Sequence, residues 1–309
     1  MKDIIVVAGP TAVGKTEYAI KIAKAIDGEV VSCDSMQLYK YMDIGSAKPT
    51  PDELAQVQHY LVDEIDPREP FSVVEYQKRA KQAIAEIHAK GKTPVISGGT
   101  GLYLNSLLYE MDFGTPPADD TFRKELEDFA AENGPEALHN RLAEKDPAAA
   151  ERIHPNNIKK VIRAIEAVEK GGEGIKPFDA VQKENKEYRP FLIGLTRDRA
   201  ELYERINLRV DILMDQGLLQ EVEDLFNMGL TEENISMKGI GYKELIQHLK
   251  GEYSLDEAID KVKQNTRRYA KRQLTWFRRY DQMQWFDLST YNSGNDALED
   301  MLSWLKRSR

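Results

Sequence analysis

The sequence is poor in the features that mark secreted or membrane-embedded proteins. Its 309 residues include one cysteine, Cys33, which excludes an internal disulfide and a cysteine-rich zinc site. It has no stretch approaching the ~20 apolar residues that a membrane span needs. The first predicted strand begins at residue 3, which leaves no room for a signal peptide. We therefore expect a cytoplasmic protein with no membrane association.

Acidic residues outnumber basic ones, 52 to 43. The net charge is −9, which argues mildly against a nucleic-acid partner because phosphate binding normally needs a basic surface. The charge is unevenly distributed, however, and one segment holds seven basic side chains, three aromatic rings and no acid. Such a segment is typical of a surface that binds a long polyanion. Its basic residues are Lys263, Arg267, Arg268, Lys271, Arg272, Arg278 and Arg279.

The clearest motif lies at the start of the chain. Residues 9–16 follow the pattern Gly-x-x-x-x-Gly-Lys-Thr between an apolar strand and an amphipathic stretch, the context that makes a phosphate-binding P-loop credible. Its glycines let backbone N–H groups approach a phosphate, and the following helix adds its dipole. Lys15 supplies positive charge, and the Thr16 hydroxyl is suited to hold Mg²⁺. The predicted pyrophosphate-binding residues are Gly9, Pro10, Thr11, Ala12, Val13, Gly14, Lys15 and Thr16.

Other candidate residues follow predicted strands. In an open α/β sheet the carboxyl ends of the strands face the ligand crevice. One strand, at residues 30–33, ends at Asp34, which either forms a turn, as an Asp before a Ser commonly does, or acts as a catalytic carboxylate. Another strand, at residues 93–97, ends in a glycine-rich turn whose Thr100 is expected to contact the substrate. The irregular segment at residues 36–49 is a plausible substrate loop.

The middle of the chain changes character. From about residue 115 to 187 the pattern is polar and helical without a strand, and glycines at positions 171, 172 and 174 break it. We therefore predict an α/β fold, with a P-loop NTPase-like parallel sheet flanked by helices and an all-helical insertion domain. The catalytic core is placed at residues 1–114 and 188–309, and the insertion at residues 115–187.

Three further features have more than one interpretation. Arg205 and Arg209 share a face of the helix predicted at residues 198–216, where they could close over phosphates or form ordinary surface ion pairs. Residues 159–163 could be a solvated helix start or a patch that contacts phosphate. His59 is expected to be structural, because the sequence offers it no partnered nucleophile.

Six segments together resemble the bacterial tRNA dimethylallyltransferase family. A P-loop with Mg²⁺ alone suggests a small-molecule kinase, but the helical insertion is larger than a simple kinase lid. The matching segments occur in the same order over nearly the whole chain. One such motif would be weak evidence for the family, whereas six together are specific. These segments are residues 9–16, 34–39, 42–49, 98–103, 239–242 and 267–276.

The resemblance implies a reaction. The chain would transfer a dimethylallyl group from dimethylallyl pyrophosphate to N6 of the adenosine immediately 3′ of the anticodon in tRNA, releasing pyrophosphate. The P-loop would then bind the isoprenoid pyrophosphate, and ATP would compete at most weakly. The implied cofactor is Mg²⁺ on Thr16, the implied partner is the anticodon stem-loop of tRNA, and the implied state is a monomer.

The resemblance also implies roles for particular residues. Asp34 would be the general base for N6, and Thr11, Lys15 and Arg209 would neutralise the leaving pyrophosphate. The target adenine must leave its stack to be reached. The residues implied to contact tRNA are Asp34, Ser35, Met36, Gln37, Thr100, Arg123, Lys159, Lys160, Val161, Ile162, Arg163, Lys238, Gly239, Ile240, Gly241, Tyr242 and Lys243.

Three other functions stay open at this point. An adenylate isopentenyltransferase would prenylate free AMP or ATP, although a free nucleotide needs neither the insertion nor the basic segment. A small-molecule P-loop kinase would transfer phosphate instead. An RNA-binding, GTPase-like switch would need a base-specificity motif that we do not find in the sequence.

Overall fold

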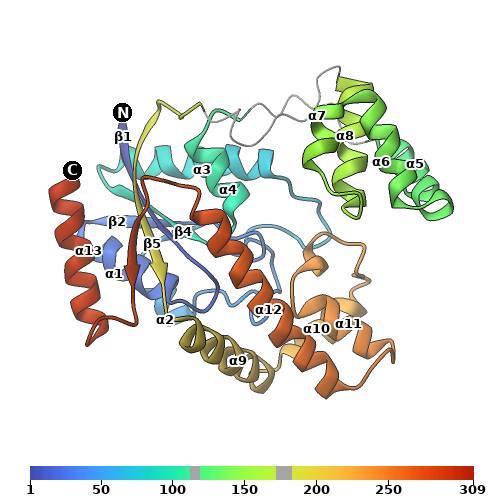
Figure 1. Cartoon of the computed structure of the whole chain (residues 1–309). Helices are drawn as coiled ribbons and strands as arrows, with labels where there is room; N and C mark the ends of the chain where they lie inside the picture. The colour runs from blue at the N-terminus through green and yellow to red at the C-terminus, as the bar shows by residue number, and fades with distance from the viewer. Residues whose placement is uncertain (112–118, 172–182) are drawn as a thin grey trace. The chain divides into compact units, whose positions relative to one another are not determined.

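The computed structural model describes residues 1–111, 119–171 and 183–309 (Figure 1). It divides into two compact units, one formed by residues 1–108 and 185–309 and the other by residues 109–184. The predicted domain boundary at residue 114, and the glycine break at Gly172 and Gly174, lie outside the described residues. Among the described helices, none is long and apolar enough to cross a membrane.

The larger unit is built on one six-stranded sheet with the strand order β3-β2-β4-β1-β5-β6. Every neighbouring pair is parallel, which confirms the predicted α/β class. The carboxyl ends of all six strands therefore meet at one edge. The strands are β1 (Lys2–Ala8), β2 (Gly28–Ser32), β3 (His59–Tyr60), β4 (Thr93–Gly98), β5 (Tyr188–Thr196) and β6 (Gln284–Asp287).

The larger unit also contains helices, some of which pack against the sheet. They are α1 (Lys15–Ala25), α2 (Pro51–Leu54), α3 (Val73–Ala89), α4 (Gly101–Leu108), α9 (Arg199–Asp215), α10 (Leu218–Asn227), α11 (Tyr242–Leu249), α12 (Leu255–Phe277) and α13 (Gly294–Ser308), with a short 3₁₀ helix η2 (Ser236–Lys238). In Figure 1, α13 lies beside α1, with which it is in contact. Ile5 and Val7 of β1 join a core with residues of α1, α9 and α13. Because β1 is central, its apolar run is buried almost throughout.

Several helix starts follow from capping residues in the sequence. Ser72 accepts a hydrogen bond from the Glu75 amide at the start of α3. Ser254 and Glu257 form a reciprocal capping box that begins α12. The sequence did not predict β3, α2, α10 or α11. Three of these have eight residues or fewer, too few for a clear periodic pattern.

The smaller unit contains the four helices predicted for the insertion. They pack around their own apolar core, in which Leu138, Leu142 and Ile165 are fully buried. The helices are α5 (Asp120–Asn133), α6 (Pro135–Lys145), α7 (Pro147–Arg152) and α8 (Ile158–Gly171).

Candidate active site

A cavity of about 1140 Å³ opens in the larger unit, where β1, β2 and β4 end. Segments from several parts of the sequence contribute to it, among them the P-loop, the residues after β2, the loop at residues 43–51, α9 and α12. The predicted catalytic residues line this one cavity. They are Thr11, Lys15, Asp34 and Arg209.

The P-loop joins β1 to α1 as its motif predicts. Gly14 has a φ of 114°, a left-handed conformation that glycine adopts without strain. Gly9 lies so close to β5 that a Cβ atom there would be 2.6 Å from the Leu195 carbonyl oxygen. Both glycines are therefore required by the backbone of the loop.

Lys15 is the first residue of α1, is partly buried and lines the cavity. Its ammonium donates to the Pro10 carbonyl at 2.8 Å. Burial lowers the pKa of Lys15 to about 8, although the nearby Asp34 charge acts in the opposite direction. A cation held out of water in this way interacts strongly with an incoming anion.

Two arginines and a glutamine brace the P-loop from outside. The Arg205 guanidinium donates to the Ala12 carbonyl at 3.0 Å, and the Arg197 guanidinium donates to the Val13 carbonyl at 3.1 Å. The Gln273 side chain accepts from the Thr11 amide and donates to the Gly99 carbonyl, both at 2.9 Å. Arg205, considered above as a second arginine over the phosphates, thus holds the loop in shape.

Arg209 lies one turn further along α9 and lines the cavity. Burial lowers its pKa, and the Asp34 charge opposes that shift. Arg209 is therefore within electrostatic range of Asp34, as Lys15 is. The cavity thus brings together two partly buried cations and one carboxylate.

Asp34 lies two residues after the end of β2, at the carboxyl edge of the sheet. One carboxylate oxygen accepts from the Met36 amide at 2.9 Å, which closes a local turn. The Ser35 amide donates to the Thr100 hydroxyl at 3.0 Å. The turn-forming role considered for Asp34 is confirmed, and the same carboxyl group also lines the cavity.

Among the residues predicted to hold the adenine, Gln37 is already engaged within the protein. Its side-chain oxygen accepts from the Ser32 hydroxyl at 3.0 Å, and its side-chain nitrogen donates to the Ala47 carbonyl at 3.1 Å. Ser35 and Met36 line the cavity beside it. Thr100 is placed between the Ser35 amide and the Tyr269 hydroxyl.

The segment at residues 238–243 requires one correction. Lys238, Gly239, Ile240 and Gly241 line the cavity, and the Lys243 side chain is exposed. Tyr242, by contrast, is fully buried, and its hydroxyl donates to Glu221 at 2.8 Å. The prediction of a tRNA contact is therefore wrong for the Tyr242 side chain, because it packs behind the segment.

The insertion requires a similar correction on α8. Lys159, Lys160 and Arg163 are exposed, but Val161 and Ile162 belong to the core of the smaller unit. The prediction of a tRNA contact is wrong for these two apolar side chains, because the opposite face of the same helix buries them. Arg123 is partly exposed and forms an ion pair of 2.7 Å with the buried Glu166, so it also has a structural role.

The basic segment lies on α12 and just beyond it. Lys263 pairs with Asp211 of α9 at 2.6 Å, and Arg267 hydrogen-bonds Asn207 of the same helix. Arg272 is exposed and also lines the cavity. The other exposed cations of the segment are Arg268, Lys271, Arg278 and Arg279.

A metal ion here would depend on few protein ligands. In the described ranges, no group of three or more His, Cys, Asp or Glu side chains could hold one. Thr16 follows Lys15 on α1 and lines the cavity. A single hydroxyl suits Mg²⁺ bound mainly by phosphate oxygens and water.

Sequence reasoning missed Gln273 and Lys48. Gln273 interrupts the apolar stripe of α12 between Ala270 and Phe277, and a polar residue in such a stripe is a signal that could have found it. The Lys48 side chain is 7% exposed and pairs with Asp43 at 2.5 Å and Asp63 at 2.7 Å. No local pattern marks Lys48. His59, expected to be structural, hydrogen-bonds the Val57 carbonyl through Nδ1.

Comparison with known proteins finds relatives that match nearly the whole chain. A family profile described as IPP transferase matches residues 37–280. The chain is 51% identical to a tRNA dimethylallyltransferase of Alkaliphilus oremlandii, with 99% of this chain and 97% of that protein aligned. It is 50% identical to a tRNA dimethylallyltransferase of Clostridioides difficile, with 99% and 98% aligned.

Solved structures show the same similarity. A tRNA isopentenylpyrophosphate transferase from Bacillus halodurans matches with 42% identity and a TM-score of 0.75, covering 99% of this chain and 96% of that one. A eukaryotic dimethylallyltransferase acting on tRNA matches with 28% identity and a TM-score of 0.82, covering 99% and 80%. The P-loop, the parallel sheet and these matches along nearly the whole chain lead to one conclusion: the chain belongs to the IPP transferase family.

Proposed function

We propose that this protein transfers a dimethylallyl group from dimethylallyl pyrophosphate to N6 of the adenosine immediately 3′ of the anticodon in tRNA. The observation that carries the proposal is the single cavity lined by Lys15, Arg209 and Asp34. It is supported by the dimethylallyltransferases and isopentenylpyrophosphate transferases that the chain resembles over nearly its full length.

The P-loop side of the cavity binds the donor. The loop amides, Thr11, Lys15 and Arg209 surround the pyrophosphate, whose negative charge grows as its bond to the allylic carbon lengthens. Because both cations are partly withdrawn from water, they need less solvent reorganisation to stabilise that charge. The P-loop thus serves a leaving group in this reaction.

The Asp34 side of the cavity receives the acceptor. The N6 amine attacks the allylic carbon, a nitrogen–carbon bond forms, and the carbon–oxygen bond breaks with its electron pair leaving on pyrophosphate. The amine must lose one proton, and the Asp34 carboxylate accepts it as the general base. The adenine reaches this carboxylate only after it leaves the stack of the anticodon loop.

Mg²⁺ fits the donor side as a cofactor. Thr16 would hold it through its hydroxyl, together with pyrophosphate oxygens. When bound, Mg²⁺ supplies positive charge to the leaving group.

The tRNA contacts the exposed cations on both units. On the smaller unit these are Lys159, Lys160 and Arg163, and on the larger unit they include Lys238, Lys243 and Arg272. Contacts of this kind position the tRNA, whereas the cavity selects the base. We propose that the enzyme acts as a monomer in the cytoplasm.

The test is transfer of label from dimethylallyl pyrophosphate to two acceptors, an unmodified tRNA with adenosine 3′ of its anticodon and free AMP. Label should enter tRNA only. Asp34→Ala should lower the rate of transfer roughly 10²- to 10⁴-fold, the usual range for loss of a general base, while donor binding persists.

The alternatives give other outcomes. Label in AMP would make the protein an adenylate isopentenyltransferase and contradict the proposed acceptor. Label in neither, together with ATP-dependent phosphate transfer to a small molecule, would make it a kinase. Saturable GTP binding would instead favour a GTPase-like switch.

A further inference from the structure

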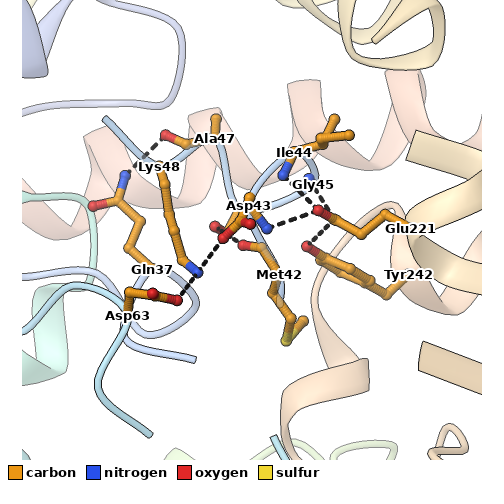
Figure 2. Close-up of polar contacts among 11 residues, drawn as sticks. Gln37, Met42, Asp43, Ile44, Gly45, Ala47, Lys48, Asp63, Glu221 and Tyr242 are labelled. Atoms are coloured by element: carbon orange, nitrogen blue, oxygen red, sulfur yellow. Dashed lines mark hydrogen bonds and ion pairs between the residues drawn. The ribbon is translucent and has the colours of Figure 1, made fainter. Parts of the chain in front are cut away.

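One carboxylate outside the cavity holds a loop that lines the cavity. The loop comprises residues 42–48, and we call it the acceptor loop because it follows Asp34 and its neighbours in the chain. Residues 43–48 line the same cavity as Asp34, whereas Glu221 of α10 and Tyr242 of α11 do not. Figure 2 shows the acceptor loop facing both side chains.

Glu221 binds three successive backbone amides of the acceptor loop. Its Oε2 accepts from the Asp43 and Ile44 amides, both at 2.7 Å, and its Oε1 accepts from the Gly45 amide at 2.9 Å. The Tyr242 hydroxyl donates to Oε1 as a fourth bond, at 2.8 Å. A concave run of backbone amides is a typical anion site, and here a side chain of the protein occupies it.

The packing around Gly45 is equally specific. A Cβ atom at Gly45 would be 2.5 Å from a ring carbon of Tyr242, closer than any real contact. Tyr242 is itself fully buried, so its ring has little room to move. Glycine is therefore needed at position 45 for the loop to lie against Glu221 and Tyr242.

The far side of the acceptor loop is fixed to the region around Asp34. The Gln37 side chain donates to the Ala47 carbonyl, and Lys48 connects Asp43 of the loop with Asp63 (Figure 2). Gln37 lies three residues after Asp34 in the chain. A shift of the acceptor loop would therefore reach the residues next to the general base.

From these contacts we propose that Glu221 is a positioning residue for the acceptor. Held by Glu221 and Tyr242, the acceptor loop forms a fixed wall for the incoming adenosine, and loss of that anchor impairs use of tRNA. Binding of the donor depends on the P-loop and on Arg197, Arg205 and Gln273, which support it. Donor binding therefore stays intact when the Glu221 contacts are lost. The inference rests on the proposed transfer reaction.

The first test is Glu221→Gln, which keeps the size of the side chain but removes its charge and one acceptor oxygen. A hydrogen bond to a charged group accounts for roughly a 10- to 100-fold change in an equilibrium. We expect kcat/KM for tRNA to fall by about that factor, while the Kd and KM for dimethylallyl pyrophosphate stay within about twofold. A general loss of folded enzyme would lower kcat alone and leave the KM for tRNA unchanged.

Glu223→Gln is the matched control. It removes the same charge from α10, and residues two positions apart on a helix face different ways. It should behave as the unchanged protein does in every assay. If the two variants had equal effects, Glu221 would act only through its charge on the surface, and the inference would be wrong.

Gly45→Ala tests the same contact from the side of the loop. Its added methyl group meets the Tyr242 ring, so it should reproduce the KM effect on tRNA without any change of charge. Combined with Glu221→Gln it should add little, because both variants release the same loop. Fully additive effects would contradict a shared anchor.

A direct structural readout is hydrogen exchange at the Asp43, Ile44 and Gly45 amides. In Glu221→Gln their exchange should speed up roughly 10- to 100-fold, while amides in the P-loop keep their rates. If the unchanged protein transfers no label to tRNA, the proposed function fails. If it does transfer label and Glu221→Gln matches it in kinetics and exchange, only the present inference fails.

Discussion

The P-loop and the acceptor loop are both irregular loops that line one cavity, yet they are held in different ways. The P-loop follows a buried strand and begins a helix, and its own glycines and Lys15 help to shape it. Side chains from distant segments, Arg197, Arg205 and Gln273, only brace this frame. The acceptor loop has no such frame. Its amides are anchored by Glu221, which lies 176 to 178 residues away in the sequence.

The two loops form two sides of the cavity that have different tasks. We call the side formed by the P-loop and Arg209 the donor wall, and the side formed by the acceptor loop the acceptor wall. The proposed donor wall offers positive charge from Lys15 and Arg209, both partly buried. In the acceptor wall the Lys48 charge is already compensated by Asp43 and Asp63, so this wall offers shape more than charge. Changes to one wall should therefore affect mainly one substrate.

Removing the donor-wall charge should have the largest effect on donor binding and catalysis. Lys15→Met keeps an unbranched side chain but leaves the developing charge on pyrophosphate without its ammonium. We expect a loss of roughly 10²- to 10³-fold in kcat/KM for dimethylallyl pyrophosphate, as for other single groups that stabilise a developing anion. Steady-state kinetics with each substrate varied in turn would measure it.

Lys21→Met is the control for that variant. It makes the same substitution on the same helix, at an exposed residue whose ion pair with Glu17 is a surface one. It should change neither substrate's kinetics by more than about twofold. A small effect of Lys15→Met, similar to that of Lys21→Met, would contradict the assigned role of the P-loop lysine.

The affinity for dimethylallyl pyrophosphate should depend on pH, and this dependence tests the role of Lys15 on the donor side. Burial lowers the pKa of Lys15 to about 8, so the free protein increasingly holds the neutral amine above that pH. Pyrophosphate favours the charged form, so binding above pH 8 requires uptake of a proton. We expect affinity for dimethylallyl pyrophosphate to fall by up to about tenfold per pH unit above 8.

Titration calorimetry of dimethylallyl pyrophosphate between pH 6.5 and 9.5 would follow this loss. Lys15→Met should bind weakly and lack the slope. A profile of the unchanged protein that stays flat through pH 9 would show that Lys15 does not titrate in this range.

Loss of the brace on the P-loop should have the smallest of these effects. Gln273→Leu leaves the Thr11 amide and the Gly99 carbonyl without their side-chain partner. We expect the free energy of unfolding to fall by about 1–3 kcal/mol, the cost of unsatisfied buried polar groups. Donor affinity should weaken by about tenfold, with a smaller change in the KM for tRNA.

The exposed Gln264 on the same helix offers the control Gln264→Leu, which should leave stability and both affinities nearly unchanged. Denaturant unfolding and donor titration compare the pair. If Gln273→Leu impaired tRNA more than the donor, Gln273 would belong functionally to the acceptor wall.

The difference between locally framed and remotely anchored segments also explains which features the sequence could predict. Strand β1, the P-loop and the capped helices follow from local patterns, and Asp34 follows from its place after a strand. The contacts of Glu221 and Gln273 join segments that are distant in the sequence, and only the interrupted apolar stripe of α12 marks Gln273. No local pattern marks Glu221 or Lys48. Val161, Ile162 and Tyr242 were misassigned because a motif does not reveal which of its side chains face the core.

The most direct measurement uses an anticodon stem-loop with either adenosine or inosine immediately 3′ of the anticodon. Inosine carries a carbonyl oxygen where adenosine carries the N6 amine, and the two RNAs are otherwise identical. With labelled dimethylallyl pyrophosphate, the account predicts label in the adenosine RNA alone. Equal label in both RNAs would contradict transfer to that amine.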